Sequence, residues 1–178
     1  MFLKAIKQKL KYRSGRNFIK QLLKVPPRGV QEEKKITSIG CIVDLDSFND
    51  SNIFYQFIEE FSLRPNSIKI IGFKKVHNKN SPYATPIFSN KDLGWNGKIE
   101  NIYALEFMNR EYDLLVNYYT DDHLLLQLMT LKTKARLRVG FGEVDKNLND
   151  LILHIPILNF NQFKKELKKY LKVLKEIE

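Results

Sequence analysis

The chain has 178 residues, a formal net charge of +10 at pH 7 and 43% hydrophobic residues, among them twelve Phe and eight Tyr. These values suit one ordinary domain with a packed core and an appendage, and they exclude a largely disordered chain. The single cysteine, Cys41, excludes an intramolecular disulfide, and no apolar run approaches the ~20 residues that span a bilayer. No apolar stretch of the secretory-signal type follows the basic start, so we expect a cytoplasmic protein without a transmembrane segment.

The positive charge is concentrated near the N-terminus. Residues 1–35 carry eleven Lys or Arg against two Glu, which gives a net charge of +9, whereas residues 36–178 have a net charge of only +1. A cationic segment on a nearly neutral body indicates a partner with an anionic surface.

The first residues have the spacing of an amphipathic helix. Apolar residues recur four positions apart on both sides of Ser14-Gly15. We expect a helix that is interrupted into two at this dipeptide and that ends before Pro26-Pro27. Residues 1–34 are therefore interpreted as a basic helical arm with its linker, and residues 35–178 as the folded domain.

Three uses of the arm are open: a grip on nucleic-acid phosphates, adsorption to an anionic membrane surface, and packing on its own domain. Arginines interleaved with Tyr12 and Phe18 favour RNA or a ribosomal surface, because cations bind phosphate and planar groups stack on bases. The apolar stripe is narrow and has no Trp, which argues against a membrane. The candidate nucleic-acid contacts are Lys4, Lys7, Lys9, Lys11, Arg13, Arg16, Lys20, Lys24 and Arg28.

Beyond the arm, strand and helix patterns alternate. Buried strands are expected at 36–43, 67–73, 112–118, 136–141 and 151–155, with a further short strand at 85–88 as an option. Helices are expected from a cap at Asp50 or Ser51 to Phe61, over 99–108, over 121–132, and from a cap at Asn161 onward. This pattern predicts an α/β fold with a single three-layer, mostly parallel, Rossmann-like sheet of about five strands and a C-terminal helix.

Polar residues follow two of these strands at the point where each strand ends. In doubly wound sheets, ligands bind beyond the carboxyl ends of the strands, where the strand order reverses. If the two strands are neighbours, four carboxylates face one crevice. The alternative interpretation is a solvated turn with helix caps at Asp121 and Asp122, and a core tyrosine whose hydroxyl bonds to the backbone. The candidate crevice residues are Asp44, Asp46, Asn117, Tyr118, Asp121 and Asp122.

The apolar run ITSIGCIV followed by Asp44-x-Asp46 resembles the first motif of haloacid-dehalogenase-type phosphatases. The resemblance implies that Asp44 is the nucleophile, Asp46 the acid/base and Mg²⁺ the cofactor. Phe48 departs from the motif, which has a small or β-branched residue there, and the later lysine and acidic strand end do not follow in order. Outside this interpretation no cofactor or metal is expected.

Other patterns of catalysis or nucleotide binding are not found in the sequence. Gly140-Phe141-Gly142 has too few glycines for a phosphate-binding loop and is interpreted as a tight turn. The three histidines, His77, His123 and His154, lack partners at metal-ligand spacing, and no Ser-His-Asp or Cys-His set can be assembled.

The stretch YDLLVNYYTDDHLLLQLMTLKTKARLRVGFG, with the segments DLGWNGKI and NDLILHIP, resembles an uncharacterised family of small basic bacterial proteins, known as a domain of unknown function. The resemblance runs over nearly the whole chain and implies no activity. The same stretch is distantly similar to the N-terminal half of heptosyltransferase-type glycosyltransferases, where a comparable strand, helix and strand end near "RIGF". That similarity implies an α/β half-domain without an independent transferase activity.

The leading functional hypothesis is non-catalytic binding, with the arm in contact with RNA or a ribonucleoprotein such as the ribosome. The alternatives are a small Mg²⁺-dependent phosphoryl-transfer or nucleotide-binding enzyme that uses Asp44 and Asp46, and a peripheral membrane-associated protein.

Overall fold

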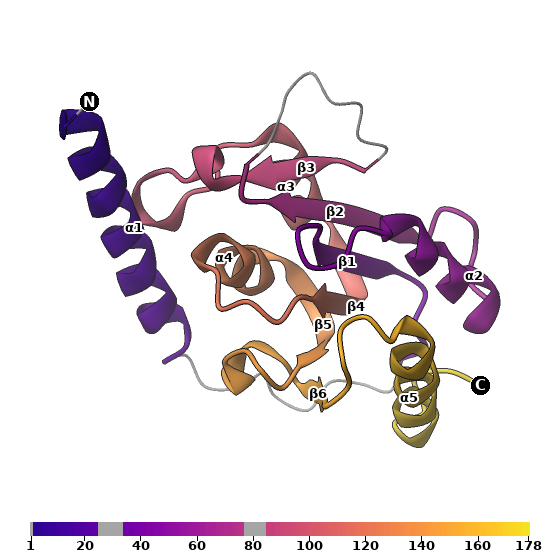
Figure 1. The fold of residues 1–178 in the computed structure, drawn as a ribbon. Coiled ribbons are helices and arrows are strands. Elements are labelled where there is room, and N and C mark those ends of the chain that lie inside the picture. Colours follow the sequence, from indigo (N-terminus) through magenta and orange to yellow (C-terminus); the bar gives the residue numbers. More distant parts are fainter. Residues whose placement is uncertain (1, 25–33, 77–84) are drawn as a thin grey trace.

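The structure is a computed structural model, and it describes residues 2–24, 34–76 and 85–178. These residues form a six-stranded parallel sheet with the strand order β3-β2-β1-β4-β5-β6 (Figure 1). The strands are β1 (Ile39–Asp44), β2 (Ile68–Lys74), β3 (Ile87–Ser89), β4 (Glu111–Tyr118), β5 (Lys134–Phe141) and β6 (Leu151–Leu153).

The strand order is that of a doubly wound sheet. The chain moves outward from β1 through β2 to β3, returns to the other side of β1 with β4, and continues to β6. The order therefore reverses between β1 and β4, which pair in parallel. The predicted Rossmann-like α/β class is confirmed. The sheet has six strands instead of about five because β3, which the sequence offered only as an option, pairs with β2.

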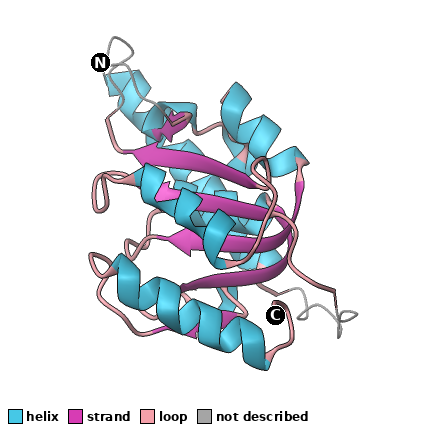
Figure 2. Ribbon diagram, turned by 90° about the vertical axis from the view of Figure 1, so that its right-hand side faces the viewer, coloured by secondary structure: helices cyan, strands magenta, loops and turns pink. Residues whose placement is uncertain are grey.

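Helices cover both faces of the sheet (Figure 2). On one face lie the 3₁₀ turn η1 (Ser51–Tyr55), α2 (Gln56–Glu60) and α5 (Phe160–Val173), with an aromatic core. On the other face lie α3 (Ile102–Asn109) and α4 (Leu124–Lys132), whose leucines and methionines build a second core. All six residues of β1 are buried, as expected for a strand that is covered on both sides.

The helix α1 (Phe2–Leu22) is one continuous helix, so the predicted break at Ser14-Gly15 is wrong. It packs against α4 and against the 3₁₀ turn η3 (Trp95–Gly97), at the side of the molecule (Figure 1). Gly15 allows a close approach to α4, since a Cβ there would lie 3.1 Å from Leu124 Cδ2. The Ser14 hydroxyl donates to the Lys11 carbonyl at 2.8 Å and accepts from the Asn96 N–H at 3.1 Å. The small residues thus serve docking, and docking outweighs the weak helix propensity of glycine.

The helix caps also differ from the sequence interpretation. His123, and not Asp121 or Asp122, caps α4, because its Nδ1 accepts from the Leu125 N–H at 3.2 Å. Asn159 caps α5 by accepting from the Gln162 N–H at 3.1 Å, whereas the predicted cap Asn161 lies inside the helix.

The predicted cap at the start of η1 is likewise not formed. Asp50 makes no side-chain cap, and the hydroxyl of Ser51 lies 2.6 Å from the Thr85 hydroxyl. Ser51 therefore ties η1 to the residues that lead into β3, instead of satisfying the first N–H groups of the turn.

Candidate functional site

The structure brings the two polar strand ends together at the carboxyl edge of the sheet. Asp44 ends β1 and Tyr118 ends β4, and β1 pairs with β4 in parallel. The condition on which the crevice hypothesis depended, that the two strands are neighbours, is therefore met. The chemistry of the crevice depends on how each side chain is used.

The Asp44 carboxylate is used within its own turn. Asp44 is 1% exposed, its Oδ1 accepts from the Asp46 N–H at 3.1 Å, and its Oδ2 accepts from the Ser47 hydroxyl at 2.6 Å. Asp46 in turn accepts from the Lys75 N–H at 2.8 Å, and its Oδ1 lies 4.0 Å from Lys74 Nζ. Both carboxylates therefore shape the turn after β1, and the Asp44 oxygens are not presented to solvent as a nucleophile requires.

Two further predicted crevice residues, Asn117 and Tyr118, are completely buried. The Asn117 amide donates to Asn149 Oδ1 at 2.7 Å and accepts from the Thr130 hydroxyl at 2.8 Å. The Tyr118 hydroxyl donates to the Ile157 carbonyl at 2.6 Å, and the Phe48 ring lies 4.8 Å from its ring. Aromatic side chains thus fill the point at which the strand order reverses, where a dinucleotide-binding fold has glycines.

The remaining acids of the predicted crevice are each paired with a polar neighbour. Asp121 Oδ2 lies 2.9 Å from Lys75 Nζ, and Asp122 accepts from the Gln127 amide. Within the described part of the chain, no three His, Cys, Asp or Glu side chains are placed to hold a metal ion together. His123 packs on Phe73, and burial lowers its pKa although the Asp121 charge opposes this shift.

The predicted nucleic-acid contacts of the arm differ in how far they are available to a partner. Lys11 faces the domain, because its Nζ donates to the Leu93 carbonyl at 2.9 Å. The predicted contact Arg28 lies outside the described residues. The other seven predicted contacts are exposed: Lys4, Lys7, Lys9, Arg13, Arg16, Lys20 and Lys24.

Four of the exposed cations lie three or four residues apart on α1, so a 3.6-residue period places them on one face of the helix. Lys24, in the turn after Leu22, follows them four residues further on, and we call the five together the cationic stripe. The stripe extends over roughly 20 Å at 1.5 Å per residue. Apart from Arg16, which contacts Tyr12, the side chains of the stripe make no hydrogen bond or ion pair within the described residues. The cationic stripe consists of Lys9, Arg13, Arg16, Lys20 and Lys24.

The apolar side chains of α1 face in two directions. In the second half of the helix, Gly15 and Ile19 are buried against the domain. In the first half, Leu3, Ile6 and Leu10 are exposed and lie on the side away from that docking face. None of the helices that the structure describes is long and apolar enough to cross a membrane.

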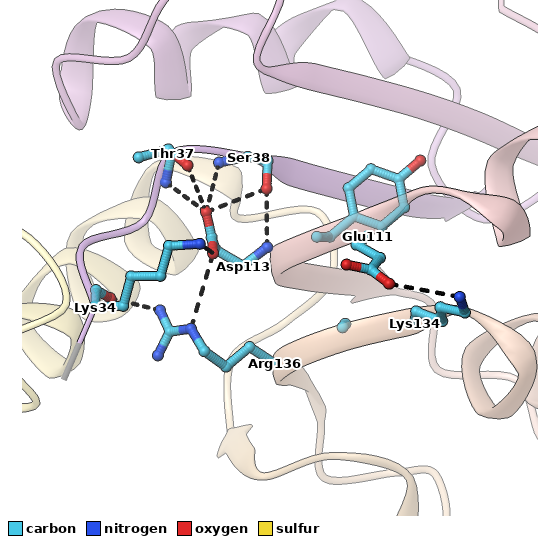
Figure 3. Close-up of a pocket in the computed structure, with 9 residues that line it drawn as sticks. Lys34, Thr37, Ser38, Glu111, Asp113, Lys134 and Arg136 are labelled. Carbon is cyan, nitrogen blue, oxygen red and sulfur yellow. Dashed lines mark hydrogen bonds and ion pairs between the residues drawn. The ribbon is translucent and has the colours of Figure 1, made fainter. Parts of the chain in front are cut away.

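A second candidate site lies at the opposite, amino edge of the sheet. Here a hollow of about 490 Å³ is lined by residues just before β1 and by the starts of β4 and β5 (Figure 3). Its central acid is Asp113, whose Oδ2 accepts from the N–H and hydroxyl groups of Thr37, at 2.8 and 2.7 Å, and of Ser38, at 3.1 and 3.2 Å. Its Oδ1 faces Lys34 Nζ at 3.3 Å and Arg136 Nε at 3.9 Å.

The Asp113 network is a structural connection at this edge. Burial alone raises the pKa of Asp113, but the Thr37 hydrogen bonds and the Lys34 ammonium outweigh burial and hold the pKa below its usual value. Arg136 continues the network, since its guanidinium donates to both oxygens of Glu176 and to the Lys34 carbonyl. The network thus joins the segment before β1, the central strands and the C-terminal residues. The one sequence signal for it was an acid in the otherwise apolar run YDLLV.

Comparison with known proteins gives a family without a described activity. Residues 11–174 match the family model described as "Family of unknown function (DUF6913)", and the chain belongs to this family. The predicted membership in a domain family of unknown function is thereby confirmed. No curated protein matches the chain, and no solved structure matches it. The similarity to heptosyltransferases stays a prediction.

Proposed function

We propose that this member of the family is a non-catalytic binding protein that contacts the phosphate backbone of RNA, free or in a ribonucleoprotein, through the cationic stripe of α1. The observation that carries the proposal is a row of five exposed cations, four on α1 and Lys24 in the turn after it, with no acidic residue in the helix. Neighbouring side chains three or four residues apart on a helix have Cβ atoms about 5–6 Å apart. A phosphate chain that runs along the helix can therefore meet several cations at once.

The positive charge at the amino end of α1 is not balanced by an acidic side chain of the helix. Its amino end carries the positive end of the helix dipole, and Lys4 and Lys7 add positive charge there with no acid in the first turn. A bound polyanion relieves this repulsion. The Arg16 guanidinium lies 5.2 Å from the centre of the Tyr12 ring and adds planar groups of the kind that stack on unpaired bases.

The geometry favours RNA over a membrane surface. A helix that adsorbs to a membrane buries a continuous apolar face. In α1 the exposed aliphatic side chains stop at Leu10, and further along that side of the helix Arg13, Asn17 and Lys20 are exposed. The apolar residues of the second half instead pack on the domain.

Binding of a labelled twelve-nucleotide single-stranded RNA, measured by fluorescence anisotropy over a range of salt concentrations, tests the proposal. Five phosphate contacts predict a slope of log K against log salt of about −3.5, or about a hundredfold weaker binding between 50 and 200 mM salt. The double variant Arg13→Gln/Lys20→Gln removes two contacts, so its slope should be about −2.

The matched control is Lys165→Gln/Lys172→Gln, which removes two exposed cations from α5. It lowers the net charge by the same amount and should bind RNA as the unchanged protein does. The proposal is wrong if the two double variants weaken binding equally, or if the protein sediments with anionic vesicles and does not bind RNA.

A further inference from the structure

A second hollow of about 490 Å³ lies under the second half of α1, beside the cationic stripe. Its walls come from α1, from the start of α4 and from the loop after β5, so it opens at the carboxyl edge of the sheet. Ligands of doubly wound sheets bind beyond this edge, and the volume falls within the range of about 300–1,000 Å³ of small-molecule sites. It is lined by Arg16, Ile19, Lys20, Leu23, Asp122, Leu124, Gln127, Glu143, Val144 and Asp145.

The lining of this hollow has three kinds of groups. Two members of the cationic stripe, Arg16 and Lys20, form one side. Ile19 and Leu124, both buried, belong to the apolar part. The acidic residues of the lining, which we call the acidic wall, come from the residues just before α4 and from the loop after β5. They include Glu143, whose carboxylate makes no hydrogen bond or ion pair within the described residues.

The other acids of this wall have acceptor capacity left as well. Asp145 uses Oδ1 for the Asn147 N–H and amide, both at 2.9 Å, and Asp122 uses Oδ1 for the Gln127 amide. The Oδ2 atoms of Asp122 and Asp145 therefore accept no hydrogen bond from the residues that the structure describes. Because an acidic wall repels phosphate, the phosphates of a bound strand must stay on the stripe, outside the hollow.

We infer that this hollow receives one unstacked base of the bound RNA and prefers a base that carries an exocyclic amino group, such as cytosine or adenine. This inference rests on the proposed function. The apolar part covers the flat faces of the base, and a carboxylate accepts from its amino group, as Asp and Glu accept from cytosine N4. Uracil has a carbonyl oxygen in place of the amino group of cytosine, so this oxygen would face the carboxylate oxygen without a hydrogen bond between them.

The test compares twelve-nucleotide oligo(C) with oligo(U), which have the same backbone charge and differ in the group at position 4 of the base. The unchanged protein should bind oligo(C) about five- to tenfold more tightly. In Glu143→Gln this ratio should fall toward one, because the amide can also donate to uracil, while the salt slope stays the same. The control Glu111→Gln alters an exposed carboxylate at the opposite edge of the sheet and should keep the ratio.

The outcomes separate this inference from the proposed function. Equal affinity for both RNAs with an undiminished salt slope overturns the base pocket and leaves RNA binding by the stripe intact. Failure to bind either RNA overturns the proposed function and the pocket together. Addition of CMP and UMP gives a second measurement, since only CMP should shift the NMR signals of the Gln127 and Val144 amides.

Discussion

Asp113→Asn is the sharpest test of how the amino edge of the sheet is held together. The substitution keeps the size of the side chain and removes its charge. One amide oxygen can still accept from Thr37 and Ser38, but the NH₂ group must then face Lys34 and Arg136, where the carboxylate now faces two cations. The hydrogen bonds from Thr37 and Ser38 then go to a neutral acceptor. At the other position the new NH₂ group faces the Lys34 and Arg136 side chains, which are also donors.

The expected cost follows from these contacts. A hydrogen bond to a charged acceptor contributes about 1.5–3 kcal/mol, against about 1 kcal/mol for a neutral one. The side chain of Lys34 is 65% exposed, so its ion pair adds little, whereas that of Arg136 is 15% exposed. We expect Asp113→Asn to lower the free energy of unfolding by about 2–3 kcal/mol, below the ~3–5 kcal/mol for one partner of a fully buried pair.

Urea unfolding followed by circular dichroism at pH 7 measures this cost, and thermal unfolding should show a decrease in Tm of roughly 5–10 °C. The control is Glu111→Gln, two residues earlier on β4 and in the same hollow, whose side chain is 80% exposed and pairs with Lys134 at 3.5 Å. It should cost less than ~0.5 kcal/mol. If both variants unfold alike, the network contributes no more than a surface ion pair and the reasoning fails.

The same network sets a pH dependence. The pKa of Asp113 is lower in the folded protein than the ~3.9 of an unfolded chain, so its stabilisation is complete above that value. This stabilisation is lost as the pH falls through the folded pKa, because the unfolded chain takes up the proton at a higher pH than the folded protein does. The stability difference between the unchanged protein and Asp113→Asn should therefore narrow below about pH 4.

Three further predictions concern docking, the core and the α4 cap. Gly15→Leu should push α1 off Leu124, increase hydrogen exchange and proteolysis within α1, and cost ~1–3 kcal/mol; unchanged protection of α1 would contradict the docking. Tyr118→Phe should lose ~1 kcal/mol, because the Ile157 carbonyl loses its donor, and should leave RNA affinity unchanged. Because burial lowers the folded pKa of His123, stability should fall in urea titrations between pH 7.5 and 5.5; His123→Asn, which can still cap, should lose less.

The sheet was predictable because its pattern is local. Runs of buried β-branched residues alternate with helical spacing, and the handedness of parallel crossovers leaves few topologies. The short strand β3 was less certain, since it follows a stretch rich in Pro, Asn and Ser and has only three residues. The adjacency of β1 and β4 stood only as a condition in the sequence, because the order of the strands depends on contacts between distant segments. A turn at Asp44 was one of the two interpretations, and the structure shows this carboxylate accepting within that turn.

Two of the errors in prediction have a common physical cause, because a side-chain contact that the local pattern does not show outweighs the local propensity. Gly15 has the signature of a helix breaker, yet the approach of Leu124 keeps it in a continuous helix. Asp121 and Asp122 have the signature of caps, yet Lys75 and Gln127 take their carboxylates and leave the cap to His123. Local propensities are of the order of ~1 kcal/mol, which one tertiary contact can outweigh.

Docking also decides what the charge of α1 can do. On a free helix, cations around the whole circumference meet a polyanion in many orientations, and ordering the helix opposes binding. Here Gly15 and Ile19 fix the orientation of the helix, Lys11 is used by the Leu93 carbonyl, and the cationic stripe stays on the outside. The same contacts place Arg16 and Lys20 in the lining of the hollow under α1. Under the proposed function, an RNA strand whose phosphates lie on the stripe would therefore have a base next to the acidic wall without a further rearrangement of the chain.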